Sequence, residues 1–179
     1  VEIGNMINSH IFDGIALTKF LYWIKNKNKK QINEYQAQSK LENFRKKNKD
    51  YLYPSFNTIA GAGKNGAIIH YRADKIRSKK IRKNDIFLCD SGGQYRYGTT
   101  DVTRTICFSR PKKYIKEIFT KVLKGHIAIA TANLNKNFNG KLLDPLARKY
   151  LIESGLDYKH GTGHGVGLSL IHISEPTRH

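Results

Sequence analysis

Cysteine and long apolar runs are scarce in this 179-residue chain, and each scarcity narrows the class of protein. Only Cys89 and Cys107 are present, which is not the composition of a disulfide-stabilised secreted scaffold, so we expect two reduced thiols. No run approaches the roughly 18 apolar residues of a membrane-spanning helix, and polar residues interrupt residues 1–24, unlike in a signal peptide. We therefore expect a cytoplasmic protein with one domain of ordinary size and no membrane partner.

Acidic residues are also few, because 14 Asp and Glu stand against 32 Lys and Arg, for a formal net charge of +18. The lysines of residues 19–50 are interspersed with Asn and Gln, which is typical of solvated helix faces and disfavours a nucleic-acid groove. A nucleic-acid-binding module remains the lesser interpretation. It predicts an affinity that falls steeply with salt.

The hydrophobic pattern predicts two helices in the first part of the chain. Apolar residues recur at helical spacing over residues 2–25, and a second helix is expected over 33–48 with Asn33 as its cap. After these helices, two short β-prone runs within 56–71 predict a hairpin. The apolar positions of the first helix are Ile3, Ile7, Ile11, Ile15, Phe20, Trp23 and Ile24.

Another helix is expected near the end of the chain. Asp144 is suited to cap it, Pro145 to occupy its first position, and Gly155 to end it.

Two apolar runs in the middle of the chain each have an aspartate at the inner end. Asp90 closes the first run and Asp101 opens the second, with glycines between them, so a hairpin with strands near 86–91 and 100–108 is expected. If the fold-back is centred between Tyr95 and Arg96, the two aspartates face each other with Cβ atoms roughly 4.5–5.5 Å apart.

Facing carboxylates are destabilising unless a cation lies between them. A pair of metal ions about 3.5–4 Å apart requires bridging carboxylates at about this separation. The spacing alone leaves open a second interpretation, in which both aspartates make turn and cap hydrogen bonds.

Histidines provide the other candidate groups. Glycine at every second position of 160–167 disfavours a helix, and an extended strand would separate His160 and His164 by roughly 13 Å, too far to bind one ion. One of the two is therefore free to bind a metal while the other has another role. His70 lies at the apolar end of the predicted 56–71 hairpin, where position alone favours a partly buried core histidine.

Several strings resemble one enzyme family. The runs DSGGQY from Asp90, GTTDVTRT from Gly98, NGAIIHY ending at Tyr71 and HGTGHGVG from His160 are similar to those of the Xaa-Pro aminopeptidases. These enzymes are pita-bread-fold metallopeptidases, related to prolidase and methionine aminopeptidase. The resemblance implies a partial α+β pita-bread fold, in which an antiparallel sheet is covered by amphipathic helices.

The resemblance also implies the site and its chemistry. It assigns Asp90, Asp101 and His164 to two divalent metal ions, for which mixed carboxylate and imidazole ligation suits Mn²⁺ first, with Zn²⁺ or Co²⁺ as alternatives. It assigns His70 to the stabilisation of the tetrahedral intermediate and His160 to the substrate side of the pocket. The implied substrate is a peptide with proline at its second position, from which the first residue is removed, and the implied full-length protein is a homodimer.

The resemblance stops after Gly167. We therefore expect a partial catalytic domain over 1–167 and a non-matching tail over 168–179, for which a foreign origin is one explanation. Relatives continue with a His-Glu pair and two glutamate ligands, so the three ligands present here predict an inactive fragment of an active enzyme. The alternative from a different class is a non-enzymatic pita-bread relative that serves as a binding or scaffold protein.

Overall fold

The computed structural model describes residues 1–27, 32–134, 139–167 and 170–171. The chain divides into two compact units, each of which is described by itself. The first unit comprises 1–109 with 165–172, and the second comprises 110–164 with 173–179.

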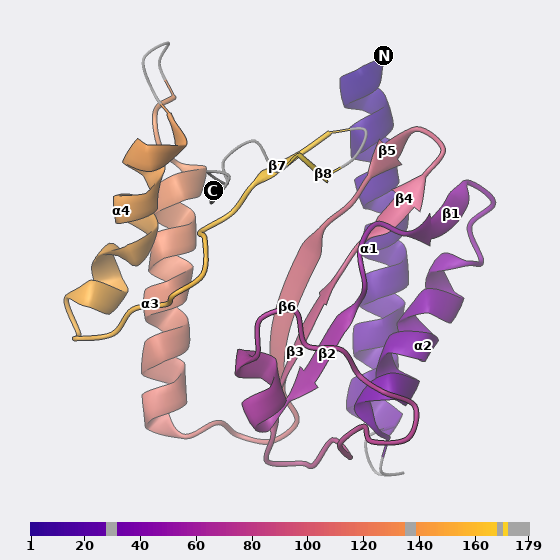
Figure 1. The fold of residues 1–179 in the computed structure, drawn as a ribbon, viewed down its shortest axis with the longest axis horizontal. Helices are drawn as coiled ribbons and strands as arrows, with labels where there is room; N and C mark the ends of the chain where they lie inside the picture. The colour runs from indigo at the N-terminus through magenta and orange to yellow at the C-terminus, as the bar shows by residue number, and fades with distance from the viewer. Residues whose placement is uncertain (28–31, 135–138, 168–169, 172–179) are drawn as a thin grey trace, which may run out of the picture. The chain divides into compact units, whose positions relative to one another are not determined.

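The first unit is built from two helices and two small antiparallel sheets. Strands β2, β3 and β6 form one sheet in that order, and β1, β4 and β5 form the other. Helices α1 and α2 lie side by side along one face of the β2-β3-β6 sheet (Figure 1). The bounds are α1 (Glu2–Lys27), α2 (Glu34–Arg45), β1 (Tyr51–Pro54), β2 (Ile59–Ala62), β3 (Ile86–Ser91), β4 (Gly93–Tyr95), β5 (Gly98–Thr99) and β6 (Val102–Cys107). A short antiparallel pair, β7 (Gly165–Val166) with β8 (Leu170–Ile171), completes the described part of this unit.

The core lies between the helices and one face of the sheet. Strand β3 alternates between buried and half-buried residues, and Phe87, Cys89 and Ser91 are the buried ones. Phe87 packs against Phe20 of α1, with ring centroids 6.5 Å apart. Because side chains alternate along a strand, Asp90 lies on the other face, which α1 and α2 do not cover.

Helix α1 is confirmed, but its buried side differs from the predicted apolar stripe. Four isoleucines that recur every fourth residue are between 49% and 78% exposed; these are Ile3, Ile7, Ile11 and Ile15. The buried positions are Ser9, Asp13, Ala16, Leu17, Phe20 and Ile24. The predicted apolar stripe was wrong for the first half of α1, because the buried side of the helix there carries the polar residues Ser9 and Asp13.

A buried ion pair explains the polar residues inside. Arg45 of α2 donates through Nε and a terminal nitrogen to the two carboxylate oxygens of Asp13, at 2.6 and 3.0 Å, and both side chains are fully buried. Arg45 also donates to Ser91 Oγ at 3.0 Å, and Tyr95 donates to Asp13 at 2.9 Å. This four-residue network joins both helices to β3 and β4.

Helix α2 begins as predicted. Asn33 accepts a hydrogen bond from the Gln36 backbone at 2.8 Å, and the Gln36 side chain accepts one from the Asn33 backbone at 3.0 Å. This reciprocal capping box fixes the start of the helix. The helix ends at Arg45, three residues before the predicted end.

The hairpin predicted within 56–71 is absent from the described structure. Strand β2 pairs with β3 instead, and the chain then turns through a 3₁₀ helix, η2 (Gly63–Ala67). A Cβ at Gly61 would lie 2.6 Å from the backbone nitrogen of Gly66, so the two backbones touch. This contact folds the segment back too tightly for a second strand.

The second unit contains two packed helices, α3 (Lys113–Ala130) and α4 (Gly140–Ile152). They approach closely at Gly125, where an added Cβ would lie 2.2 Å from the carbonyl oxygen of Ala147. Among the described residues, no helix is long and apolar enough to cross a membrane.

The predicted start of α4 was wrong. The helix begins at Gly140 and is capped by Asn139, so Asp144 and Pro145 lie inside it. A proline within a helix removes one backbone hydrogen bond, a loss tolerated here because the helix is packed against α3. The helix ends at Ile152, three residues before the predicted end, and Gly155, with φ of 69° in the left-handed region, closes the turn that follows it.

Candidate metal and substrate site

Asp90 lies near the end of β3 on the face of the sheet away from α1 and α2. Its partner across the sheet is Thr103, whose hydroxyl donates to Asp90 Oδ1 at 2.6 Å. Beyond β3 and β6 the chain continues into β4 and β5, where Tyr95 pairs with Gly98 in the same register. The hairpin is confirmed, but its fold-back is centred one residue later than predicted.

Asp101 is therefore not directly opposite Asp90, as the sequence had predicted. It immediately precedes β6 and stands two residues before Thr103. Because alternation has a period of two, Asp101 is expected on the same face as Asp90, as its diagonal neighbour. Diagonal Cβ atoms lie roughly 7–8 Å apart, which leaves more room for cations than direct opposition does.

The two cysteines are free, as expected, and they differ in environment. Cys89 is buried, and burial raises the pKa of its thiol to about 12. Cys107 is half-buried at the far end of the sheet, opposite Ile86. Cys89 therefore lacks the low pKa and the exposure of a reactive cysteine.

His70 lies in a tight turn after η2. Tyr71 closes this turn by donating its backbone N–H to the Ile68 carbonyl at 3.2 Å, and His70 is exposed with φ of 57°. Among the described residues, His70 is the only one besides glycine with positive φ. Sparsely populated backbone conformations of this kind tend to occur at functional sites.

A buried carboxylate, Glu34, fixes the segment that carries His70. It accepts hydrogen bonds from the Tyr71 hydroxyl at 2.7 Å, from the Ala62 backbone at 2.8 Å and from the Lys79 backbone at 2.9 Å. The Asn65 amide donates to both of its oxygens. Sequence reasoning missed Glu34, whose only local signal is an acidic residue in the first turn of a helix.

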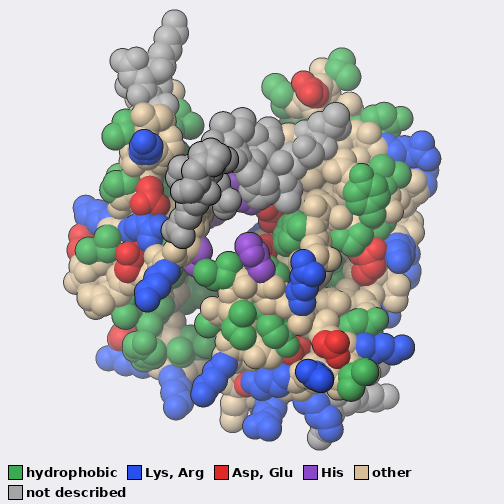
Figure 2. Space-filling model, viewed as in Figure 1, with side chains coloured by type: hydrophobic (Ala, Val, Ile, Leu, Met, Phe, Trp, Pro, Cys, Tyr) green, Lys and Arg blue, Asp and Glu red, His purple; other side chains and the backbone are tan. Residues whose placement is uncertain are grey.

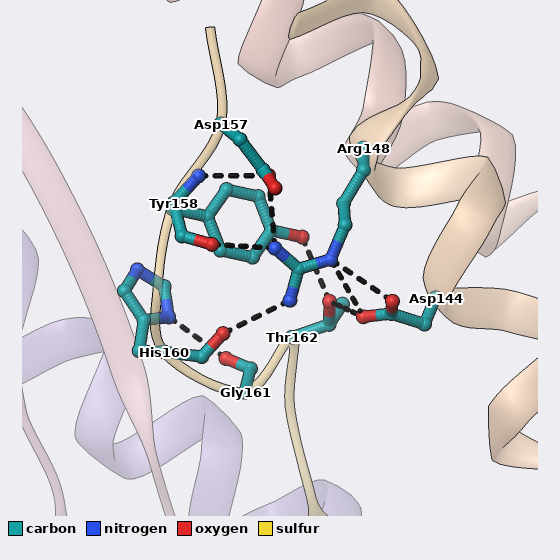
Figure 3. A network of polar contacts seen from close by, with 7 residues as sticks. All are labelled: Asp144, Arg148, Asp157, Tyr158, His160, Gly161 and Thr162. Atoms are coloured by element: carbon teal, nitrogen blue, oxygen red, sulfur yellow. Dashed lines mark hydrogen bonds and ion pairs between the residues drawn. The ribbon is translucent and has the colours of Figure 1, made fainter. Parts of the chain in front are cut away.

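His160 lies in a loop of the second unit, shown in Figure 3, and His164 follows it in the chain. Residues 160–164 are not in a strand, contrary to the prediction, and the strand β7 begins only at Gly165. The His160 ring stacks on the Tyr158 ring with centroids 4.6 Å apart, and its Nδ1 donates to the Gly161 carbonyl at 2.8 Å. Both His160 and His164 are exposed.

Arg148 of α4 is the centre of the polar network around this loop (Figure 3). It pairs with Asp144 one turn earlier on the helix, at 2.9 Å, and with Asp157 of the loop, also at 2.9 Å. The Thr162 hydroxyl and then Arg148 lower the pKa of Asp144, and Arg148 lowers the pKa of Asp157. Sequence reasoning missed Arg148, although its spacing of four from Asp144 is that of a helical ion pair.

The predicted site residues thus fall in both units. Asp90, Asp101 and His70 belong to the first unit, whereas His160 and His164 belong to the second. Within the described part of the chain, no three His, Cys, Asp or Glu side chains form a group able to hold a metal. The meeting of Asp90, Asp101 and His164 around one metal pocket stays a prediction.

The surroundings of Asp90 fit a metal ligand. Ligating carboxylates are themselves hydrogen-bonded in proteins, and the Thr103 hydroxyl provides such a bond while leaving the other carboxylate oxygen available. Carboxylate and imidazole donors suit hard or borderline divalent ions.

A separate groove of about 780 Å³ runs along the start of α1, beside Tyr97 and Val166. None of the five predicted site residues lines it. Residues of α1 form most of its wall, among them Ile3, Ile7 and Ile11 of the exposed stripe.

The dispersed positive charge is visible on the surface. In Figure 2, Lys and Arg side chains line the lower edge of the face shown and occur singly elsewhere on it, with Asp and Glu side chains among them. This distribution is typical of a solvated surface.

Known proteins resemble the chain over nearly its whole length. The model of metallopeptidase family M24 matches residues 4–178. A probable Xaa-Pro aminopeptidase P from Podospora anserina is 47% identical over 178 residues, which cover 98% of this chain and 26% of the relative. The chain thus spans about a quarter of the length of that relative.

Solved structures agree with the sequence match. An X-prolyl aminopeptidase from Caenorhabditis elegans, described as a cytosolic enzyme with a di-nuclear active site, superposes with a TM-score of 0.89 at 39% identity, covering 96% of this chain and 29% of that one. An Xaa-Pro dipeptidase from Bacillus anthracis superposes with a TM-score of 0.82 at 28% identity, covering 95% and 46%. The fold is the partial α+β pita-bread fold that the sequence predicted, and the chain belongs to metallopeptidase family M24.

Proposed function

We propose that the chain forms part of the catalytic unit of an Xaa-Pro aminopeptidase, which removes the first residue of peptides with proline in second position. The observation that carries the proposal is the placement of Asp90, with its Thr103 hydrogen bond, on the face of the sheet that α1 and α2 leave uncovered. A chain with this feature that is 47% identical to a probable Xaa-Pro aminopeptidase P is expected to share its chemistry.

Two divalent ions, Mn²⁺ first and Zn²⁺ or Co²⁺ otherwise, are the proposed cofactors. Asp90, Asp101 and His164 are the residues of this chain that would hold them. When bound, such ions supply Lewis acidity and lower the pKa of water so that it attacks at neutral pH. The Thr103 hydroxyl would orient the Asp90 carboxylate toward them.

The two other histidines would act on the substrate. An N–H of His70 would donate to the oxygen of the scissile carbonyl as negative charge develops there, a contribution that is large in a site from which water is excluded. The strained turn and the Glu34 hydrogen bonds would hold His70 in place. His160 would contact the substrate near its proline.

The remaining properties follow from the same assignment. We expect a cytoplasmic location, as described for the Caenorhabditis elegans relative, and a homodimer for the full-length protein. The dispersed positive charge does not call for a nucleic-acid partner.

The test compares hydrolysis of an Xaa-Pro peptide with that of the matching Xaa-Ala peptide by the full-length protein. We expect cleavage of the Xaa-Pro peptide alone, with loss on chelation and recovery with Mn²⁺. Asp90→Asn and Asp101→Asn should each abolish activity and weaken metal binding measured by calorimetry. Asp74→Asn is the matched control, because Asp74 is exposed and accepts only backbone hydrogen bonds in its own turn.

Absence of cleavage by a folded, metal-loaded wild-type protein would contradict the proposal. It would favour the alternative of a pita-bread binding or scaffold protein.

A further inference from the structure

The side chain of Arg148 makes more polar contacts than one helical ion pair requires. It is 17% exposed and reaches from α4 to the loop that carries His160. Its Nε donates to both oxygens of Asp144, at 3.0 and 2.9 Å. Its two terminal nitrogens, Nη1 and Nη2, are directed away from the helix and donate hydrogen bonds to the loop (Figure 3).

Three loop groups accept from these terminal nitrogens. Nη1 donates to Asp157 Oδ1 at 2.9 Å and to the Tyr158 carbonyl at 2.5 Å, and Nη2 donates to the His160 carbonyl at 3.0 Å. A loop without regular structure satisfies its carbonyl groups with side chains or with water. One planar guanidinium here fixes two carbonyl oxygens on either side of Lys159.

Ring stacking extends the contact to the imidazole. The guanidinium carbon of Arg148 lies 4.0 Å from the centroid of the Tyr158 ring, and the His160 ring is stacked on the same tyrosine at an interplanar angle of 21°. The orientation of the His160 ring is therefore set through Tyr158 by Arg148.

A second link leads further along the loop. The Thr162 hydroxyl donates to Asp144 and lies 2.7 Å from the Tyr158 hydroxyl. The pair formed by Asp144 and Arg148 thus fixes the loop on both sides of Gly161, at His160 and at Thr162, and Thr162 lies two residues before His164.

We propose that Arg148 is a positioning residue that sets the orientation of the His160 ring and the course of the loop to His164. The inference rests on the proposed function, because it gives these histidines a catalytic context. Lysine cannot replace Arg148 in this role, since an ammonium lacks the planar fork that holds Asp144 and two carbonyls at once.

The first measurement does not depend on activity. His160 ring protons, observed by NMR in full-length protein labelled with ¹³C at histidine and assigned with His160→Asn, should be shifted upfield by the Tyr158 ring. Arg148→Lys and Arg148→Gln should remove that shift. Lys141→Gln, an exposed change on the same helix, should leave it unchanged.

The second measurement is kinetic. With the Xaa-Pro peptide, Arg148→Lys should lower kcat/KM roughly 10–100-fold, the usual cost of misplacing a group at a metal or catalytic site. The circular dichroism spectrum should stay that of the wild type, because the lysine retains a charge beside Asp144. Lys141→Gln should retain wild-type kcat/KM.

The two proposals fail in different ways. An inactive wild-type protein whose His160 shift still responds to Arg148→Lys contradicts the proposed function and supports the positioning role. An active wild-type protein whose His160 shift and kcat/KM are both unaffected by Arg148→Lys overturns the positioning role. A lower melting temperature in Arg148→Gln with the His160 shift retained also overturns it, because Arg148 would then only stabilise the fold.

Discussion

Replacing Glu34 by glutamine tests the buried contact on which the position of His70 depends. The glutamine has the shape of the glutamate but replaces one acceptor oxygen by an NH₂ group. Glu34 Oε1 accepts from the Ala62 backbone and Oε2 accepts from the Lys79 backbone and the Tyr71 hydroxyl. Either orientation of the new amide therefore leaves one backbone N–H without its acceptor.

The magnitude follows from these contacts. A buried donor left unsatisfied costs about 1–3 kcal/mol, and each remaining hydrogen bond loses the extra strength that comes from a charged acceptor. We expect Glu34→Gln to lower the free energy of unfolding by about 3 kcal/mol. This is a large part of the roughly 5–15 kcal/mol of a typical domain.

Urea unfolding followed by circular dichroism measures this loss. Glu42→Gln is the matched control on the same helix, because Glu42 accepts one side-chain hydrogen bond, from Tyr51 at 2.7 Å, and a glutamine oxygen can replace that acceptor. The control should cost less than about 1 kcal/mol. Equal losses in the two variants, or a loss below about 1 kcal/mol for Glu34→Gln, would refute the reasoning.

Three further predictions concern other buried groups. Burial and a carboxylate acceptor raise the pKa of Tyr71 to about 12. Because the unfolded chain loses this proton near pH 10, the free energy of unfolding should fall as pH rises from about 10 to 12. Tyr71→Phe should show a shallower fall in unfolding titrations against pH. Arg45→Met leaves the Asp13 carboxylate buried without its cationic partner and should cost about 3–5 kcal/mol in thermal unfolding. The double variant with Asp13→Leu should recover part of this loss, and a double variant less stable than the single one would contradict the reasoning. Gly92→Ala should destabilise the protein by at least about 1–3 kcal/mol, because its Cβ would lie 1.8 Å from a carbonyl oxygen. Gly14→Ala, in open space on α1, should stabilise it by about 0.5–1 kcal/mol. Similar melting temperatures for the two variants would contradict this prediction.

The sequence by itself determined the elements whose signals are local. Helical periodicity identified α1, Asn33 as a cap residue identified the start of α2, and the glycine-rich turn between two apolar runs identified the hairpin of β3 and β6. The motifs around Asp90 and His160 identified the family, because they join several residue types at fixed spacing. Such signals act over a few residues, so they can be read without knowledge of the fold.

The tertiary structure decided which faces are buried and which polar groups meet. Asp13 turns inward because Arg45, 32 residues away, pairs with it, and Glu34 is buried because donors from 62 to 79 converge on it. A shift of one residue in the centre of the fold-back moves the partner of Asp90 by two residues, from Asp101 to Thr103. These pairings depend on the closure of long loops and on burial, which no local pattern encodes, and they are what positions the candidate site.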